Sequence, residues 1–109
     1  MSETYKFEYI KEQFAALIAV DCEPELTITL NGQNYMVIGY EDHVSIQRLG
    51  DAHPVEIAFS SLDALYEAET VDGICLKRDW DRISSMHSHE FDQIDVLTEI
   101  HKLKQDSAH

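Results

Sequence analysis

The sequence has few basic residues. Eight Lys and Arg stand against 21 Asp and Glu, which gives a formal net charge of −13 at pH 7. Coulomb repulsion makes nucleic acids and anionic membranes poor direct partners for such a chain and favours a basic protein surface. No block of five or six like charges occurs, so we expect folded elements, and not an acidic tail, to carry the excess.

Other absences narrow the class of protein. No stretch approaches the roughly 18 apolar residues of a membrane span, and residues 1–9 lack the apolar segment of a secretory signal. Two cysteines, 53 positions apart, are too few for a disulfide framework and predict buried thiols in a reducing compartment. Four Gly, two Pro and 44% apolar residues in 109 predict one globular domain over residues 1–109, in the cytoplasm.

The first half of the chain predicts a helix followed by an antiparallel sheet. Apolar residues three and four apart predict a helix from near Ser2, the expected N-cap, to about residues 20–21. Alternating apolar residues then predict strands near residues 26–30, 35–38, 44–47 and 55–59. Asn31-Gly32 is typical of a two-residue hairpin turn. We expect a four-stranded antiparallel meander with one face covered by helices.

The second half predicts helices only, which makes the fold class α+β. Ser60 and Ser61 precede a short helix near residues 62–66. The spacing of Leu76, Trp80 and Ile83 predicts a second short helix. A C-terminal helix is expected over about residues 88–104.

The acidic residues of that last helix form a candidate partner-binding face. Asp92, Asp95 and Glu99 are three and four residues apart, so they would form one carboxylate stripe with a repeat of about 5 to 6 Å. This repeat is similar to the phosphate spacing of a nucleic-acid strand, and Arg and Lys of a basic protein could contact it in place of phosphates. The second candidate face is Glu67, Glu69 and Asp72. The alternative is that both are ordinary solvated surfaces.

A close pair of histidines suggests a metal hypothesis. His87 and His89 stand where the sequence predicts the junction of two helices. Structural zinc takes four ligands, so Cys75, Asp79, Asp92 or another histidine would have to complete the site. The alternative is that both are exposed loop and cap histidines.

Catalytic motifs are missing from the sequence. It contains no glycine-rich phosphate loop, no Gly-x-Ser-x-Gly elbow and no His-Glu-x-x-His pattern. Pairs of carboxylates occur, but a chain with 21 acids contains such pairs without any acid–base role. We therefore do not expect an enzyme.

The order of segments after the hairpin sheet resembles a known group of proteins. Residues 59–65, 71–77 and 80–83 are similar in layout to small acidic proteins carried by phages and mobile elements, among which are anti-CRISPR inhibitors. The resemblance covers about residues 26–83 and rests on layout and charge. It implies a protein of the bacterial host cytoplasm that blocks DNA loading or recognition by a CRISPR effector nuclease, either as a DNA mimic or by binding a remote basic lobe of the nuclease.

Two further function classes fit the same sequence. An immunity protein that neutralises a basic nuclease toxin would use the same charge, with very tight one-to-one binding. A metal-stabilised binding domain would depend on the histidine pair and zinc more than on the charge. The sequence leaves the oligomeric state open.

Overall fold

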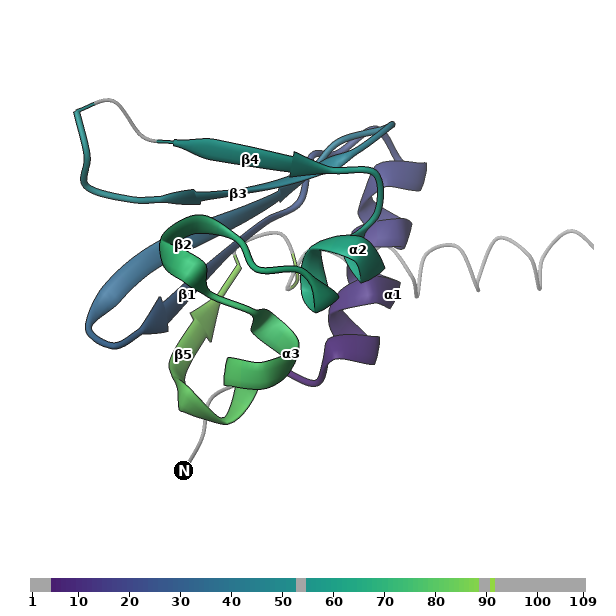
Figure 1. Cartoon of the computed structure of the whole chain (residues 1–109). Coiled ribbons are helices and arrows are strands. Elements are labelled where there is room, and N and C mark those ends of the chain that lie inside the picture. Colours follow the sequence, from purple (N-terminus) through teal and green to yellow (C-terminus); the bar gives the residue numbers. More distant parts are fainter. Residues whose placement is uncertain (1–4, 53–54, 89–90, 92–109) are drawn as a thin grey trace, which may run out of the picture.

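The computed structural model describes residues 5–52, 55–88 and 91, and their fold is α+β (Figure 1). Helix α1 (Phe7–Ala19) precedes strands β1 (Glu25–Leu30), β2 (Gln33–Gly39), β3 (Val44–Arg48) and β4 (Glu56–Phe59). Helix α2 (Leu62–Glu67), the 3-10 turn η1 (Val71–Gly73), helix α3 (Leu76–Asp79), the 3-10 turn η2 (Trp80–Arg82) and strand β5 (Ile83–His87) follow. No helix of this part of the chain is long and apolar enough to cross a membrane.

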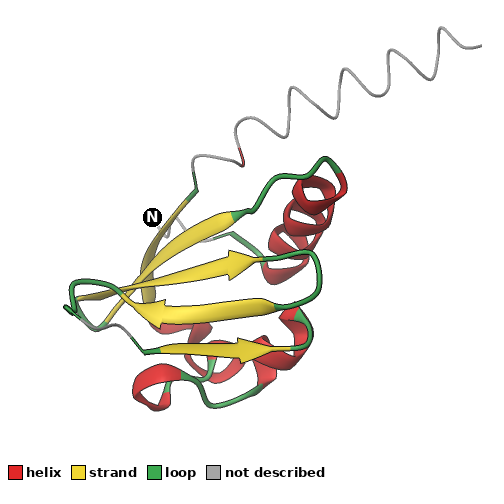
Figure 2. Cartoon of the chain, turned by 90° about the horizontal axis from the view of Figure 1, so that it is seen from above, coloured by secondary structure: helices red, strands yellow, loops and turns green. Residues whose placement is uncertain are grey.

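The sheet has five strands in the order β4-β3-β2-β1-β5, and each neighbouring pair is antiparallel. The expected four-strand meander is present as β1 to β4, but the expectation of four strands is wrong because β5 pairs with β1 at the sheet's other edge. Figures 1 and 2 show the described helices on one side of the sheet. The sequence therefore predicts the class and the covered face, and misses one edge strand.

The missed strand is explained by a bulge. Leu30 of β1 pairs with Ile83 and Thr29 pairs with Ser85, so Ser84 is an additional residue in β5. A bulge breaks the two-residue alternation of a strand. It leaves Ile83 and Met86, three residues apart, both buried. That spacing imitates a helix, which is why Ile83 is wrongly expected in the second short helix.

The structure confirms the predicted hairpin turn and the predicted cap of α2, but not the predicted cap of the first helix. Asn31 and Gly32 have φ values of 53° and 77°, as the predicted hairpin turn requires. The Ser61 side chain accepts a hydrogen bond from the Ala64 N–H at 3.1 Å and so caps α2 as expected. The expected cap at Ser2 is wrong, because α1 begins at Phe7 with Lys6 at the N-cap position.

The core lies between the covered sheet face and the helices. Apolar side chains of α1, β1, β2, β3, α2, α3 and β5 form one cluster, which includes Ile10, Leu17, Ile28, Val37, Ile46, Leu65, Leu76 and Met86. Phe91 joins it at 1% exposure, with its ring packed against Tyr5, Tyr9 and Phe14. Val55, expected in the fourth strand, is 62% exposed and precedes β4. Except for Ser88 and Phe91, the predicted C-terminal helix lies outside the described residues.

Candidate functional site

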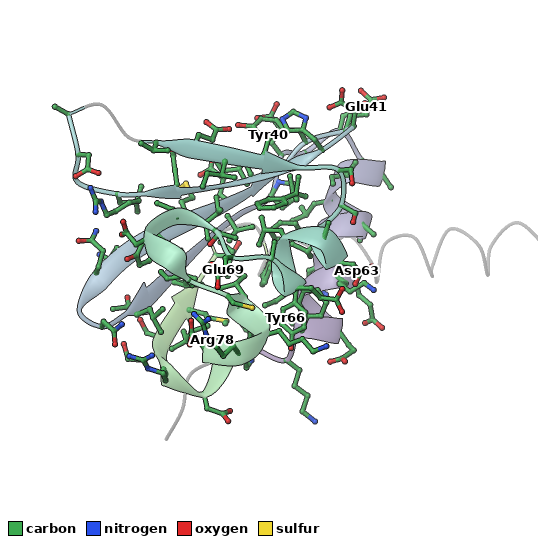
Figure 3. The ribbon with its side chains drawn as sticks, viewed as in Figure 1. Tyr40, Glu41, Asp63, Tyr66, Glu69 and Arg78 are labelled. Atoms are coloured by element: carbon green, nitrogen blue, oxygen red, sulfur yellow. The ribbon has the colours of Figure 1, made fainter. Side chains whose placement is uncertain are left out.

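The first predicted contact face cannot be placed, because Asp92, Asp95 and Glu99 lie outside the described residues. The second face is described, and its three carboxylates each pair with a cation. Glu67 Oε1 lies 3.5 Å from Lys77 Nζ, and Glu69 Oε1 lies 3.8 Å from Arg78 Nη1. These two pairs are exposed and lie near α2 and α3 (Figure 3).

Asp72 belongs to a separate cluster on the β3 side of the fold. Its Oδ1 lies 3.1 Å from Arg48 Nη1, and its Oδ2 accepts a hydrogen bond from the Tyr35 hydroxyl at 2.8 Å. Burial, followed by the hydrogen bond to the Asp72 carboxylate, raises the pKa of Tyr35 to about 12. Arg48 also pairs with Asp51 at 2.7 Å. The structure thus gives the three predicted carboxylates cations of the chain itself as partners, in two separate clusters.

The residues proposed for zinc are divided between two faces of the sheet. His87 ends β5 opposite Thr27, on the face away from the buried pair Ile28 and Met86. It is therefore in a strand, and its expected place between two helices is wrong. Cys75 precedes α3 on the helical side, with its thiol 3.6 Å from the Glu67 carbonyl oxygen.

No group of three or more His, Cys, Asp or Glu side chains in the described ranges could hold a metal ion. His89 lies outside those ranges. The zinc site therefore stays a prediction, and its test is elemental analysis.

Asp79, one of the two acids considered as zinc ligands, instead organises α3. Its side chain is 6% exposed and accepts hydrogen bonds from Arg78 Nε and Nη2 at 3.1 and 3.0 Å. The Cys75 N–H donates to the same carboxylate at 3.2 Å, and Arg82 Nη1 lies 3.6 Å away. These contacts make Asp79, the last residue of α3, a structural carboxylate that caps the start of this short helix through the Cys75 N–H.

A different acidic surface lies at the end of the sheet where β2 meets β3. The β2–β3 turn carries Glu41 and Asp42, and the connection from α1 to β1 carries Asp21 and Glu23. Glu41 lines two hollows here, of about 280 and 250 Å³, and Ile18 of α1 is the other residue common to both. We call this surface the acidic end. Figure 3 shows Tyr40 and Glu41 there, distant from Glu69 and Arg78.

The acidic end also contains an ordered pair of rings. Tyr40 and His43 stack with centroids 4.4 Å apart and planes 15° from parallel. His43 Nδ1 lies 2.6 Å from Asp42 Oδ1, and this hydrogen bond with the imidazole lowers the pKa of Asp42. The Tyr40 N–H donates to the His43 carbonyl oxygen at 2.8 Å and closes the turn. The turn therefore holds two rings and the Asp42 carboxylate in a defined arrangement.

Most ion pairs of the described Lys and Arg side chains lie outside the acidic end. Arg48, Lys77, Arg78 and Arg82 pair with carboxylates away from it, and only Lys11 among the described cations lines its larger hollow. Among the described residues, the carboxylates outside any Lys or Arg ion pair are Glu8, Glu12, Asp21, Glu23, Glu25, Glu41, Asp42, Glu56 and Asp81. Four of these nine make up the acidic end.

These four residues are not among the candidates predicted from the sequence, although the predicted hairpin indicates that they lie close together. Glu41 and Asp42 fall between two predicted strands, and Asp21 and Glu23 fall at and after the end of the predicted first helix. In an antiparallel hairpin, the start of the first strand and the end of the second strand lie at the same end of the hairpin, opposite its turn. The predicted β1–β2 hairpin therefore already places the two acidic segments side by side.

Comparison of the chain with protein-family models, curated protein sequences and solved structures finds no match.

Proposed function

We propose that this chain is a non-enzymatic acidic inhibitor, which binds a basic nucleic-acid-handling protein and competes with its nucleic acid. The observation that supports the proposal is the distribution of charge. Every described Lys and Arg except Lys6 forms an ion pair with a carboxylate, whereas the four carboxylates of the acidic end are in no such pair and lie beside two hollows with one lysine nearby. A surface of this kind attracts a basic partner over the range of the Debye length, about 10 Å at 0.1 M salt.

The first partner to test is a CRISPR effector nuclease, whose DNA loading or recognition the chain would block. A basic nuclease toxin, neutralised by an immunity protein, presents the same charge. The two partners differ in the reaction that the chain would inhibit, and purified nucleases of each kind distinguish them.

The test is retention of partners at two salt concentrations. The chain is immobilised and exposed to bacterial lysates that express candidate CRISPR effectors and nucleases, at about 0.1 M and about 0.5 M salt, because screening differs strongly between them. The proposal expects a basic effector or nuclease that is retained at the lower concentration and weakened at the higher. Retention of no basic protein, or retention that is indifferent to salt, would contradict it.

The predicted stripe on the C-terminal segment has its own test. Replacement of Asp92, Asp95 and Glu99 together by Ser is expected to weaken the complex by about tenfold or more and to flatten its salt dependence, since charge-assisted contacts are lost. Glu56→Ser, at an exposed carboxylate of β4, is the control and is expected to change little. A triple variant that binds as the control does would show that the stripe is a solvated surface.

A further inference from the structure

The larger hollow of the acidic end is an open surface cavity with an apolar floor. It measures about 280 Å³, close to the lower limit of roughly 300 Å³ for ligand pockets. It opens where α1, the β2–β3 turn and the β4–α2 connection meet. Its apolar lining consists of Phe14, Ala15, Ile18, Val44 and Leu62. Such a floor suits the aliphatic part of a long side chain.

The rim of this cavity carries more carboxylates than cations. Glu41, Asp42 and Asp63 line it, together with Lys11 and the hydroxyls of Ser60 and Ser61. Lys11 Nζ already lies 2.9 Å from Asp63 Oδ1, so its charge is balanced within the rim. Glu41 and Asp42 remain as the carboxylates with no Lys or Arg partner among the described residues. A cationic ligand is therefore favoured.

The backbone next to the cavity favours a cation as well. Helix α1 ends at Ala19, beside the second hollow, and its last turn contains no basic residue. The Leu17 and Ile18 carbonyl groups accept backbone hydrogen bonds here, but the aligned peptide dipoles still give the C-terminus of a helix partial negative charge, which cations stabilise. Asp21 and Glu23 add negative charge to the same end. These groups make the second hollow negative, and that hollow adjoins the cavity through Ile18 and Glu41, which line both.

The stacked rings of Tyr40 and His43 point to one kind of cation. Both rings line the cavity, and their planes lie 15° apart. A guanidinium is planar, stacks on aromatic faces and binds carboxylates through two parallel hydrogen bonds, whereas an ammonium is a compact, strongly hydrated charge. We propose that this cavity is the docking site for an arginine side chain of the basic partner. The inference rests on the proposed function and specifies where and through which residue type the partner binds.

The test uses a small probe and NMR. Acetyl-Gly-Arg-Gly-amide is titrated into the ¹⁵N-labelled full chain, alongside the same peptide with lysine and with citrulline, the uncharged analogue of arginine. We expect saturable amide shifts confined to residues lining the cavity, at positions 11, 14, 15, 18, 40–44 and 60–63. Binding is expected to be about fivefold weaker for lysine and to be lost for citrulline. Equal binding of the lysine peptide would overturn the assignment to arginine, and equal binding of citrulline would overturn the role of charge.

Variants separate cavity binding from general attraction to an acidic protein. The double variant Glu41→Gln, Asp42→Asn is expected to weaken arginine binding by about fivefold or more. The matched control Glu56→Gln, Asp81→Asn removes the same charge elsewhere and is expected to change it less than twofold. An equal loss in both variants, or shifts spread to Glu56 and Asp81, would overturn the cavity site. The amide spectra of the free variants verify that each is folded.

The same variants distinguish failure of this inference from failure of the proposed function. In one outcome, both double variants bind a basic nuclease as well as the native chain does, in a salt-sensitive complex. That result would overturn arginine docking in the cavity and leave the proposed function standing. Saturable arginine binding in the cavity, with no basic protein retained from lysates, would contradict the function and leave the cavity site standing.

Discussion

Among the single substitutions, Asp79→Ala most directly tests whether the buried Asp79 carboxylate stabilises the fold. The carboxylate is 6% exposed and accepts hydrogen bonds from Arg78 and from the Cys75 N–H. Truncation leaves the partly buried Cys75 N–H without its acceptor, and an unsatisfied buried group costs about 1–3 kcal/mol. Arg78 and Arg82 are 56% and 61% exposed, so water replaces their lost contacts at little cost.

We therefore expect Asp79→Ala to lower the free energy of unfolding by about 1–3 kcal/mol, which corresponds to about 4–12 °C in Tm for a domain of this size. Urea unfolding followed by the fluorescence of Trp80, the only tryptophan, measures the change. The control is Asp81→Ala, at an exposed carboxylate two positions away, expected to stay within about 0.5 kcal/mol of the native chain.

The pH dependence provides a second readout. The hydrogen bonds from Arg78 lower the pKa of Asp79 in the folded chain. A carboxyl with a lowered folded pKa stabilises above its unfolded pKa, about 3.9, and that stabilisation is lost as the pH falls through the folded value. Asp79→Ala should therefore lose stability less steeply below about pH 4 than the native chain does. An unchanged slope, together with a change in stability below about 0.5 kcal/mol, would refute the reasoning.

Three further predictions follow from single features of the fold. Gly39→Ala is expected to destabilise by about 1–3 kcal/mol, because a Cβ there would lie 2.8 Å from Cγ of the buried ring of Pro24; thermal unfolding that matches the native chain would contradict this contact. Ser61→Ala removes the side-chain acceptor of the Ala64 N–H and is expected to cost about 1 kcal/mol in chemical unfolding, whereas Ser61→Asp should retain most of the stability. Elemental analysis of the untagged protein tests the zinc prediction: it expects about one zinc per chain, and less than about 0.2 would exclude a structural requirement for metal.

The elements set by local chemistry could be predicted from the sequence. The first hairpin follows from alternating apolar residues around Asn31-Gly32, and the start of α2 follows from the Ser61 cap. Both depend on residues close together in the chain. β5 could not be predicted in this way, because its bulge at Ser84 removes the alternation and its pairing with β1 joins segments far apart in the sequence.

The sequence predicts the sign of the charge at the candidate site, and the predicted hairpin brings its two acidic segments together, but the sequence does not show that these carboxylates stay without a Lys or Arg partner. The composition indicates that a basic partner is favoured. It does not show which carboxylates form ion pairs with Lys or Arg of the same chain. Glu67, Glu69 and Asp72 are as acidic in the sequence as Glu41 and Asp42, yet the fold places lysine or arginine beside the first three. Ion pairs between distant segments have no local signature, so only the folded structure separates the two sets.

The most direct test of the central claim is competition with nucleic acid. The purified chain is added to the basic nuclease that it retains, and cleavage of a labelled DNA substrate is measured at increasing DNA concentration. The account predicts inhibition that excess DNA relieves and that weakens as salt rises, since both ligands use the same cationic surface. Inhibition that excess DNA does not relieve, or no inhibition by a chain that binds the nuclease, would contradict it.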